Sequence, residues 1–297
     1  MVALDTELPL KSRDSLEIAT GYIPKLGMKL YLTEQQMKNV DAMIAQNLPL
    51  NTIVDNIFND TTRVIEGIWE RIEDIFLSEL SSGYGLSTRD GATGIRLNMN
   101  FYEANQFLVS NLWDGKDATP LEDIRKIVEK AVEDGNTIID AYADDTALQL
   151  LYKNESVRAQ FAFNQGVAMT GTTSVPVLDF GKVQQLFLAQ WGINLHRIAR
   201  RVKTELNGVQ KNHNPWKKGN ITFVCDDNLG SLAWTTVAEA ARPVDGVVYQ
   251  TADQFILAKK YSTTDPLREF TASEAMVVPI LNNVDRIYTL DTQTVQE

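Results

Sequence analysis

The chain has 297 residues, of which 44% are hydrophobic and 23% are charged. This is the composition of an ordinary globular protein and excludes disorder as its main state. The formal net charge of −11 disfavours a protein whose main task is to grip nucleic-acid phosphates, because such proteins carry a basic excess. We expect one large domain or two closely packed ones.

The single cysteine, Cys225, cannot form an internal disulfide, which fits a reducing compartment. The sequence has no run of about 18 apolar residues that could cross a membrane. The first ten residues include Asp5 and Glu7 and lack the basic start and apolar stretch of a signal peptide. These features predict a protein that assembles in a cytoplasm without contacting a membrane.

Residues 1–32 mix polar and apolar side chains without helical periodicity, and Pro9, Gly21, Pro24 and Gly27 interrupt them. This pattern predicts an extended arm or a long hairpin, and a frayed terminus explains it equally well.

Two helices are predicted next. Thr33 and Gln36 form a capping-box pattern for a helix that ends near Asn47. Residues 51–82 predict a longer helix of roughly 45 Å, a spine for other elements, because apolar residues recur mostly at intervals of four. Asp60 is an alternative start for a shorter helix. The apolar residues are Ile53, Ile57, Val64, Ile68, Ile72, Phe76 and Leu80.

Several further elements have recognisable starts. Thr119, followed by Pro120 and Glu122, predicts a capped helix that ends at Gly135. Three more helices are predicted to begin at Asp144, Asn154 and Asp179. Strands are predicted over residues 95–101, 193–202, 220–225, 247–249, 255–259 and 286–290.

The sequence contains little from which to build an active site. His196 and His213 match no metal-binding pattern, and both read as solvated or hydrogen-bonded surface side chains. Residues 166–174 lack the lysine of a phosphate loop. Carboxylates beside Cys225 would raise the pKa of its thiol, which predicts a buried structural cysteine. We expect no enzyme activity, no cofactor and no metal. The carboxylate pairs at 144–145 and 226–227 have better explanations as a helix cap and a turn.

Charge is distributed unevenly along the chain. The segment from Arg197 to Lys218 holds seven Lys or Arg residues and one acid, Glu205. One interpretation is a solvated sheet face. The other is a basic patch that docks on an acidic patch of a neighbouring copy, as heterologous contacts in a homo-oligomer require. The hypothesised contact residues are Arg197, Arg200, Arg201 and Lys203 on the basic side and Glu133, Asp134, Asp144 and Asp145 on the acidic side.

Three segments together resemble a known family. They are EGIWERIEDIFLSEL at 66–80, followed by SSGYGL, then LWDGKDATPLEDIRKIVEKAVEDG at 112–135, and REFTASEAMVVPILNNVDRIYTLDT at 268–292. In this order they are similar to the spine helix, the tryptophan–proline–helix segment and the C-terminal end of tailed-phage major capsid proteins. The resemblance is to the lambda-like major capsid protein E family.

The resemblance implies an α+β, HK97-like capsid fold with a long spine helix. It implies an N-terminal arm and extended loop over residues 1–32, a peripheral domain over 33–117 and an axial domain over 118–240. Residues 241–297 would return to the peripheral domain. An extended loop of roughly residues 10–32 would lie over an adjacent subunit.

The function implied is structural. Copies would assemble into hexamers and pentamers of an icosahedral phage head, around double-stranded DNA that they contact only weakly. The expected partners are a scaffolding protein, a portal and a decoration protein, and the expected location is the virion, after assembly in the host cytoplasm. One alternative is an encapsulin-like compartment enclosing a cargo enzyme. Another is a hydrolase that uses the paired carboxylates.

Overall fold

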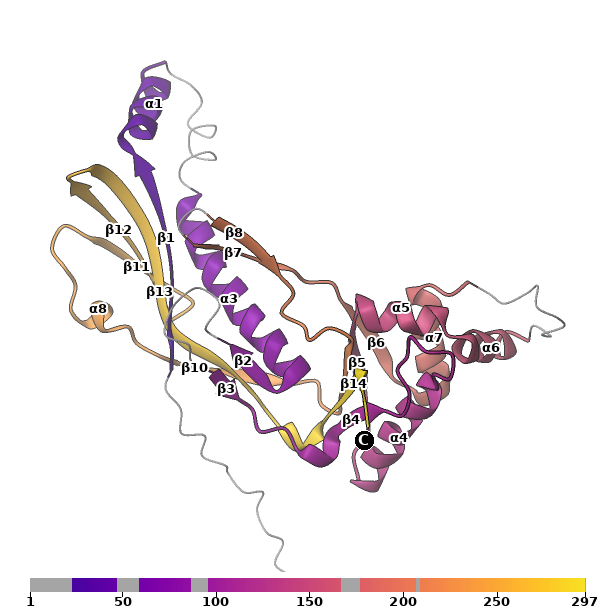
Figure 1. Ribbon diagram of the computed structural model, residues 1–297. Coiled ribbons are helices and arrows are strands. Elements are labelled where there is room, and N and C mark those ends of the chain that lie inside the picture. Colours follow the sequence, from indigo (N-terminus) through magenta and orange to yellow (C-terminus); the bar gives the residue numbers. More distant parts are fainter. Residues whose placement is uncertain (1–22, 47–58, 87–95, 167–176, 207–208, 297) are drawn as a thin grey trace, which may run out of the picture.

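The computed structural model describes residues 23–46, 59–86, 96–166, 177–206 and 209–296. The molecule is elongated, with a long helix lying on one sheet at one end and a cluster of helices around a second sheet at the other (Figure 1). The mixture of helices and strands confirms the predicted α+β class.

The first sheet supports the long helix α3 (Asp60–Ser82). Its strand order is β1-β13-β12-β11, and β10 also pairs with β13. All of these pairings are antiparallel. The strands are β1 (Lys25–Thr33), β10 (Gly230–Thr235), β11 (Val248–Ala252), β12 (Ile256–Thr264) and β13 (Leu267–Leu281). Ile68 and Ile72 of α3 pack with Leu26, Ile256 and Val277 of the sheet.

The helix α3 follows the apolar periodicity of the sequence. Val64, Ile68, Ile72 and Leu80 are all buried, as their spacing predicts. The helix begins at Asp60, which was the alternative start, and the predicted residues 51–58 lie outside the described part of the chain. It ends at Gly83, whose φ of 72° is left-handed.

The second sheet has the order β4-β14-β9-β5-β6. β14 is parallel to β4, β5 is parallel to β6, and β9 is antiparallel to both of its neighbours. Four helices share its hydrophobic core, which includes Ile127, Leu148, Phe187, Phe223 and Tyr288. The elements are β4 (Gln106–Val109), β5 (Asp140–Asp144), β6 (Asn194–Ile198), β9 (Asn220–Val224), β14 (Ile287–Val295), α4 (Pro120–Glu133), α5 (Asp145–Lys153), α6 (Glu155–Asn164) and α7 (Phe180–Trp191).

Most of the predicted helix starts are confirmed. Thr33 and Gln36 form the capping box of α1 (Glu34–Ala45). The side chains of Asp144, Asn154 and Asp179 cap α5, α6 and α7. The capping box at Thr119 is wrong: α4 begins at Pro120 as expected, but the Thr119 side chain makes no capping hydrogen bond. Proline at the first position, with its fixed φ, suits the start of that helix by itself.

The remaining elements are short. A ribbon of β2 (Tyr84–Leu86) and β3 (Arg96–Asn98) follows α3, as the glycine-rich segment predicts, and the residues connecting its strands lie outside the described part. A second ribbon joins β7 (Val202–Leu206) to β8 (Val209–His213), so the single strand predicted over 193–202 is wrong and divides into β6 and the start of β7. The others are η2 (Glu103–Asn105), α8 (Ala238–Ala241) and η3 (Val284–Arg286).

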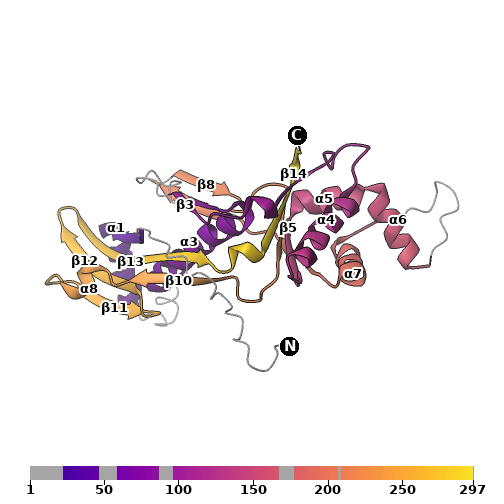
Figure 2. The same cartoon turned by 90° about the horizontal axis from the view of Figure 1, so that it is seen from below.

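Each sheet is built from distant segments of the chain. β10 pairs with β13 beside α3, whereas β14 pairs with β9 in the helix-covered sheet. Figure 2 shows the chain crossing between the two ends through β10 and through the segment that joins β13 to β14. The domain boundaries given above stay a prediction.

Candidate assembly surfaces

Two of the four hypothesised basic residues form ion pairs within their own chain. The Arg197 Nε atom lies 2.5 Å from Oδ1 of Asp145, because the parallel pairing of β5 and β6 brings the two residues together. Arg200 lies 3.0 Å from Glu73 and 3.4 Å from Glu70 of α3. Arg197 and Arg200 therefore orient elements of one subunit.

Arg201 and Lys203 are both exposed, and neither forms an ion pair with another residue of the described ranges. They are the two basic candidates that stay available to a neighbouring copy.

The acidic candidates also differ from one another. Asp144 is buried, and its Oδ1 accepts hydrogen bonds from the backbone amides of Ala147 (2.9 Å) and Gly219 (3.2 Å). Its assignment to an exposed acidic patch is therefore wrong: the carboxylate is used inside the fold as a helix cap. Asp134 binds Lys130, whose hydrogen bond holds the pKa of the Asp134 carboxyl below its usual value. Glu133 is exposed.

A group of aromatic and basic side chains lies across three strands of the α3 sheet, and we call it the aromatic tip. Tyr31 and Tyr261 stand opposite Phe270 in the strand register, with ring centroids 5.8 and 5.1 Å from the Phe270 ring. Lys29 lies 4.8 Å from the centre of the Phe270 ring, and Arg268 lies 4.6 Å from that of Tyr31. Tyr31 is 47% exposed, so the tip presents aromatic surface beside two cations.

Strand alternation explains which way this group faces. Leu26 and Ala275 occupy the opposite phase of β1 and β13 and pack against α3. The odd-numbered residues of β1 and the even-numbered residues of β13 therefore turn to the other face, which the aromatic tip occupies.

The outward side of α3 carries a row of carboxylates, which we call the acidic row. Glu66, Glu70 and Glu73 follow one another at helical spacing. The side chains of Glu70 and Glu73 are 54% and 44% exposed, although Arg200 contacts both. Arg63 lies one turn before Glu66 and reduces the negative charge at that end.

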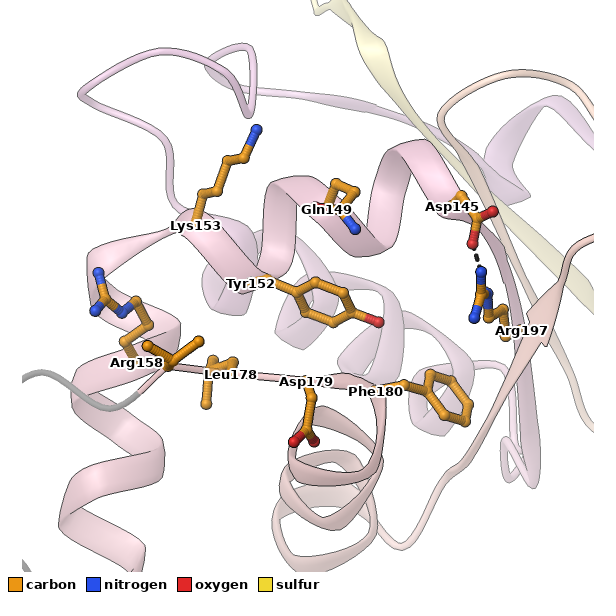
Figure 3. Close-up of a pocket in the computed structure, with 10 residues that line it drawn as sticks. Asp145, Gln149, Tyr152, Lys153, Arg158, Leu178, Asp179, Phe180 and Arg197 are labelled. Carbon is orange, nitrogen blue, oxygen red and sulfur yellow. Dashed lines mark hydrogen bonds and ion pairs between the residues drawn. The ribbon is translucent and has the colours of Figure 1, made fainter.

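An open depression of about 600 Å³ lies among α5, α6 and the start of α7. Figure 3 shows Tyr152 projecting toward its centre, with the Arg197–Asp145 pair on one side and Lys153 and Arg158 on the other. Burial raises the pKa of the Tyr152 phenol. Among the described residues, the lining of this depression contains no histidine, serine or cysteine.

Both histidines pair with an aspartate. Nε2 of His196 lies 2.9 Å from Oδ1 of Asp140, and its ring stacks on Tyr142. Nε2 of His213 lies 2.6 Å from Oδ1 of Asp74. Both side chains are hydrogen-bonded, which confirms that part of the prediction. Among the described residues, no three histidine, cysteine or acidic side chains are grouped so that they could hold a metal.

Cys225 is buried, which confirms the prediction for this residue. Burial, the main cause, raises the pKa of its thiol to about 11, and the carboxylates of Asp226 and Asp285 act in the same direction. A thiol with so high a pKa is a poor nucleophile at neutral pH.

Across the described ranges, no helix combines the length and the apolar character that crossing a bilayer requires.

No protein-family model and no curated protein sequence matches the chain. Solved structures that share its fold include two phage-derived or phage-related proteins. One is the assigned capsid protein of a prophage of E. coli CFT073, with 14% identity and a TM-score of 0.60 over 90% of this chain and 76% of that one. The other is a phage-related protein of Bordetella bronchiseptica RB50, with 10% identity and a TM-score of 0.51 over 93% of this chain and 77% of that one.

These two similarities show which fold the chain has. The chain has the HK97-like capsid fold, as the sequence resemblance implied. α3 is the spine helix of that fold, confirmed from Asp60 onward.

Proposed function

We propose that this chain is the major capsid protein of a tailed phage, and that its task is assembly without bond chemistry. The observation that supports this is the extent of the likeness to the assigned prophage capsid protein, which takes in 90% of the chain and leaves no large region for another function. The buried cysteine and the hydrogen-bonded histidines agree with a structural role.

In this proposal the α3 sheet forms the peripheral domain and the helix-covered sheet forms the axial domain of a capsomer subunit. Hexamers and pentamers would close an icosahedral shell, with scaffolding, portal and decoration proteins as further partners. The location would be the virion, after assembly in the host cytoplasm. The net charge of −11 suits a shell that holds packaged double-stranded DNA weakly.

We further propose that the aromatic tip of one copy docks on the acidic row of another. The tip offers Lys29 and Arg268 beside exposed aromatic surface, and the row offers three carboxylates with Arg63 and Arg200 at its edges. Surfaces of opposite charge on one chain favour a heterologous contact, which can close into a ring. Each contact can be weak, because many act together in a shell. Arg201, Lys203 and Glu133 are proposed as a second, peripheral set of contact residues.

The experiment is electron microscopy of the purified full chain, expressed alone and together with a phage scaffolding protein. Closed shells or rings of five and six subunits would support the proposal, and uniformly small particles under both conditions would contradict it.

The contents of shells produced in the native host separate a phage head from a compartment for a cargo enzyme. Nuclease-protected double-stranded DNA supports the phage head, whereas a protein cargo without DNA supports the alternative. We favour the phage head because both solved structures reported above are described as phage-derived or phage-related.

A further inference from the structure

Glu79, near the C-terminal end of α3, is a buried carboxyl. Its relative exposure is 0%, and neither carboxyl oxygen has a hydrogen-bond partner among the residues that the structure describes. An ionised carboxylate in such a place is costly, because nothing replaces the water that it loses. Burial alone raises the pKa of Glu79 to about 8.

The backbone of the α3–β2 turn covers this carboxyl. A methyl group added at Gly85 would lie 2.5 Å from Oε1 of Glu79, so only glycine allows this approach. The hydroxyls of Ser78 and Ser82 both donate to the carbonyl oxygen of Tyr84, at 3.0 and 3.2 Å, and hold the turn down. The amide of Met99 donates to the carbonyl of Gly83 (2.9 Å), which ties the β3 side to the same turn.

Charged groups whose side chains the structure describes do not account for this arrangement. At this end of α3 they are Tyr84 on β2, Tyr142 on β5 and Lys217 before β9, which pairs with Asp291 of β14, and β9 itself has none. Asp74, one turn and a half earlier on α3, is bound to Arg71 and His213. Desolvation is the sole cause of the shifted pKa of Glu79.

We propose that Glu79 is a proton-sensitive latch: the neutral carboxyl lets the turn at residues 83–85, with β2 and β3, close over the end of α3, and the ionised carboxylate opens it. Opening hydrates the carboxylate, so the open form binds the proton more weakly than the closed form. Linkage then requires that the opening equilibrium rise with pH between the ordinary pKa of a glutamate and about 8, and level off above. This latch does not rest on the shell function.

The test is hydrogen exchange of the Met99 amide and of peptides covering residues 83–85 and 97–99, followed from pH 5 to pH 9. Wild type is compared at each pH with Glu79→Gln, which cannot ionise, so that the intrinsic pH dependence of exchange cancels. Protection in wild type should fall by about tenfold per pH unit relative to Glu79→Gln, up to about pH 8. The difference between the two proteins should be smallest at pH 5.

Three more variants keep the test decisive. Glu155→Gln removes an exposed carboxylate from α6, away from this turn, and should behave as wild type. Glu79→Met supplies a second neutral side chain if the glutamine variant does not fold. Gly85→Ala should raise exchange at every pH, because its methyl group displaces the carboxyl. Wild-type exchange parallel to that of both neutral variants over the whole range would overturn the latch.

Discussion

The imidazole of His213, at the end of β8, lies 2.6 Å from the buried carboxylate of Asp74 on α3. Asp74 is 1% exposed and also binds Arg71 at 2.7 Å. This contact fastens the β7–β8 ribbon, which begins just after the basic residues Arg200 and Arg201, to the spine helix. The position of Arg200 and Arg201 therefore depends on a pairing between residues 139 positions apart.

His213→Ala should lower the free energy of unfolding by about 1–3 kcal/mol, because it removes a partner from a buried carboxylate. Urea unfolding measures the change. The control is His196→Ala: this side chain is 45% exposed, and its loss should cost less than about 1 kcal/mol. Equal losses in the two variants would show that the contact with Asp74 has no special weight.

Reversing charges should test the contact between the aromatic tip and the acidic row. Lys29→Glu with Arg268→Glu should reduce assembly, and Glu66→Lys with Glu70→Lys should do the same, because each places like charges opposite one another. Combining all four changes should restore assembly, measured as the fraction of protein in large particles by light scattering.

The matched control for this contact is Lys153→Glu, an exposed position on α5 in the helix-covered sheet, outside both surfaces. It should assemble as wild type does. If the four-residue variant assembles no better than either double variant, the two surfaces are not partners, even where wild type forms shells.

Acid should destabilise the fold because it protonates two carboxylates that pair with the same lysine. Lys259 contacts Glu239 at 2.5 Å and Glu274 at 2.8 Å. Its hydrogen bond lowers the pKa of Glu239. Burial raises the pKa of Glu274, but hydrogen bonds from Lys25 and Lys259 more than compensate and leave it lowered. Since both folded-state pKa values lie below the ordinary 4.5, this stability is present above pH 4.5 and is lost as the pH falls further.

Lys259→Met should therefore cost about 2 kcal/mol near pH 7 and progressively less below pH 4.5, measured by urea unfolding at each pH. Lys38→Met, which removes an exposed lysine from α1, should leave the pH profile near that of wild type. A loss for Lys259→Met that stays constant down to pH 3 would contradict the account.

Cys225 should resist thiol reagents in the folded protein. With a thiol pKa of about 11, only about one molecule in a thousand carries the thiolate at pH 8, and the side chain is also buried. Reaction with a disulfide reagent at pH 8 should be at least about a hundredfold slower in native buffer than in denaturant. Comparable rates in the two conditions would show that the site is open.

Local chemistry made several elements predictable from the sequence. The caps at Thr33, Asp144, Asn154 and Asp179 use side chains that bond to amides two or three residues away, so the signal is contained in a short segment. The apolar periodicity of α3 is equally local, because one helix face meets one sheet.

β13 could not be read in the same way. It pairs along its length with β1, β12 and β10, and its buried positions include Thr271, Ser273 and Ala275. The buried hydroxyl of Ser273 is satisfied because it donates to the carbonyl of Val64 on α3 (2.6 Å). No local sequence pattern indicates this contact. Pro279 within the strand further obscures it.

The charge hypothesis was limited for the same reason. The charge pattern of the sequence assigns Arg197 and Asp145 to opposite patches on neighbouring copies, whereas the parallel pairing of β5 and β6 makes them neighbours in one chain. The aromatic tip also depends on strand register, which brings Tyr31, Phe270 and Tyr261 into one row. Nothing in the spacing of Glu79 separated it from the exposed glutamates of the same helix.

The central claim is that copies of this chain assemble with one another. Sedimentation velocity of the purified full chain over a range of concentrations tests it most directly. The account predicts species near five or six times 33.3 kDa together with much faster particles, and predicts that the charge reversals at the aromatic tip reduce both. A single species of 33.3 kDa at every concentration, with or without a scaffolding protein, would contradict it.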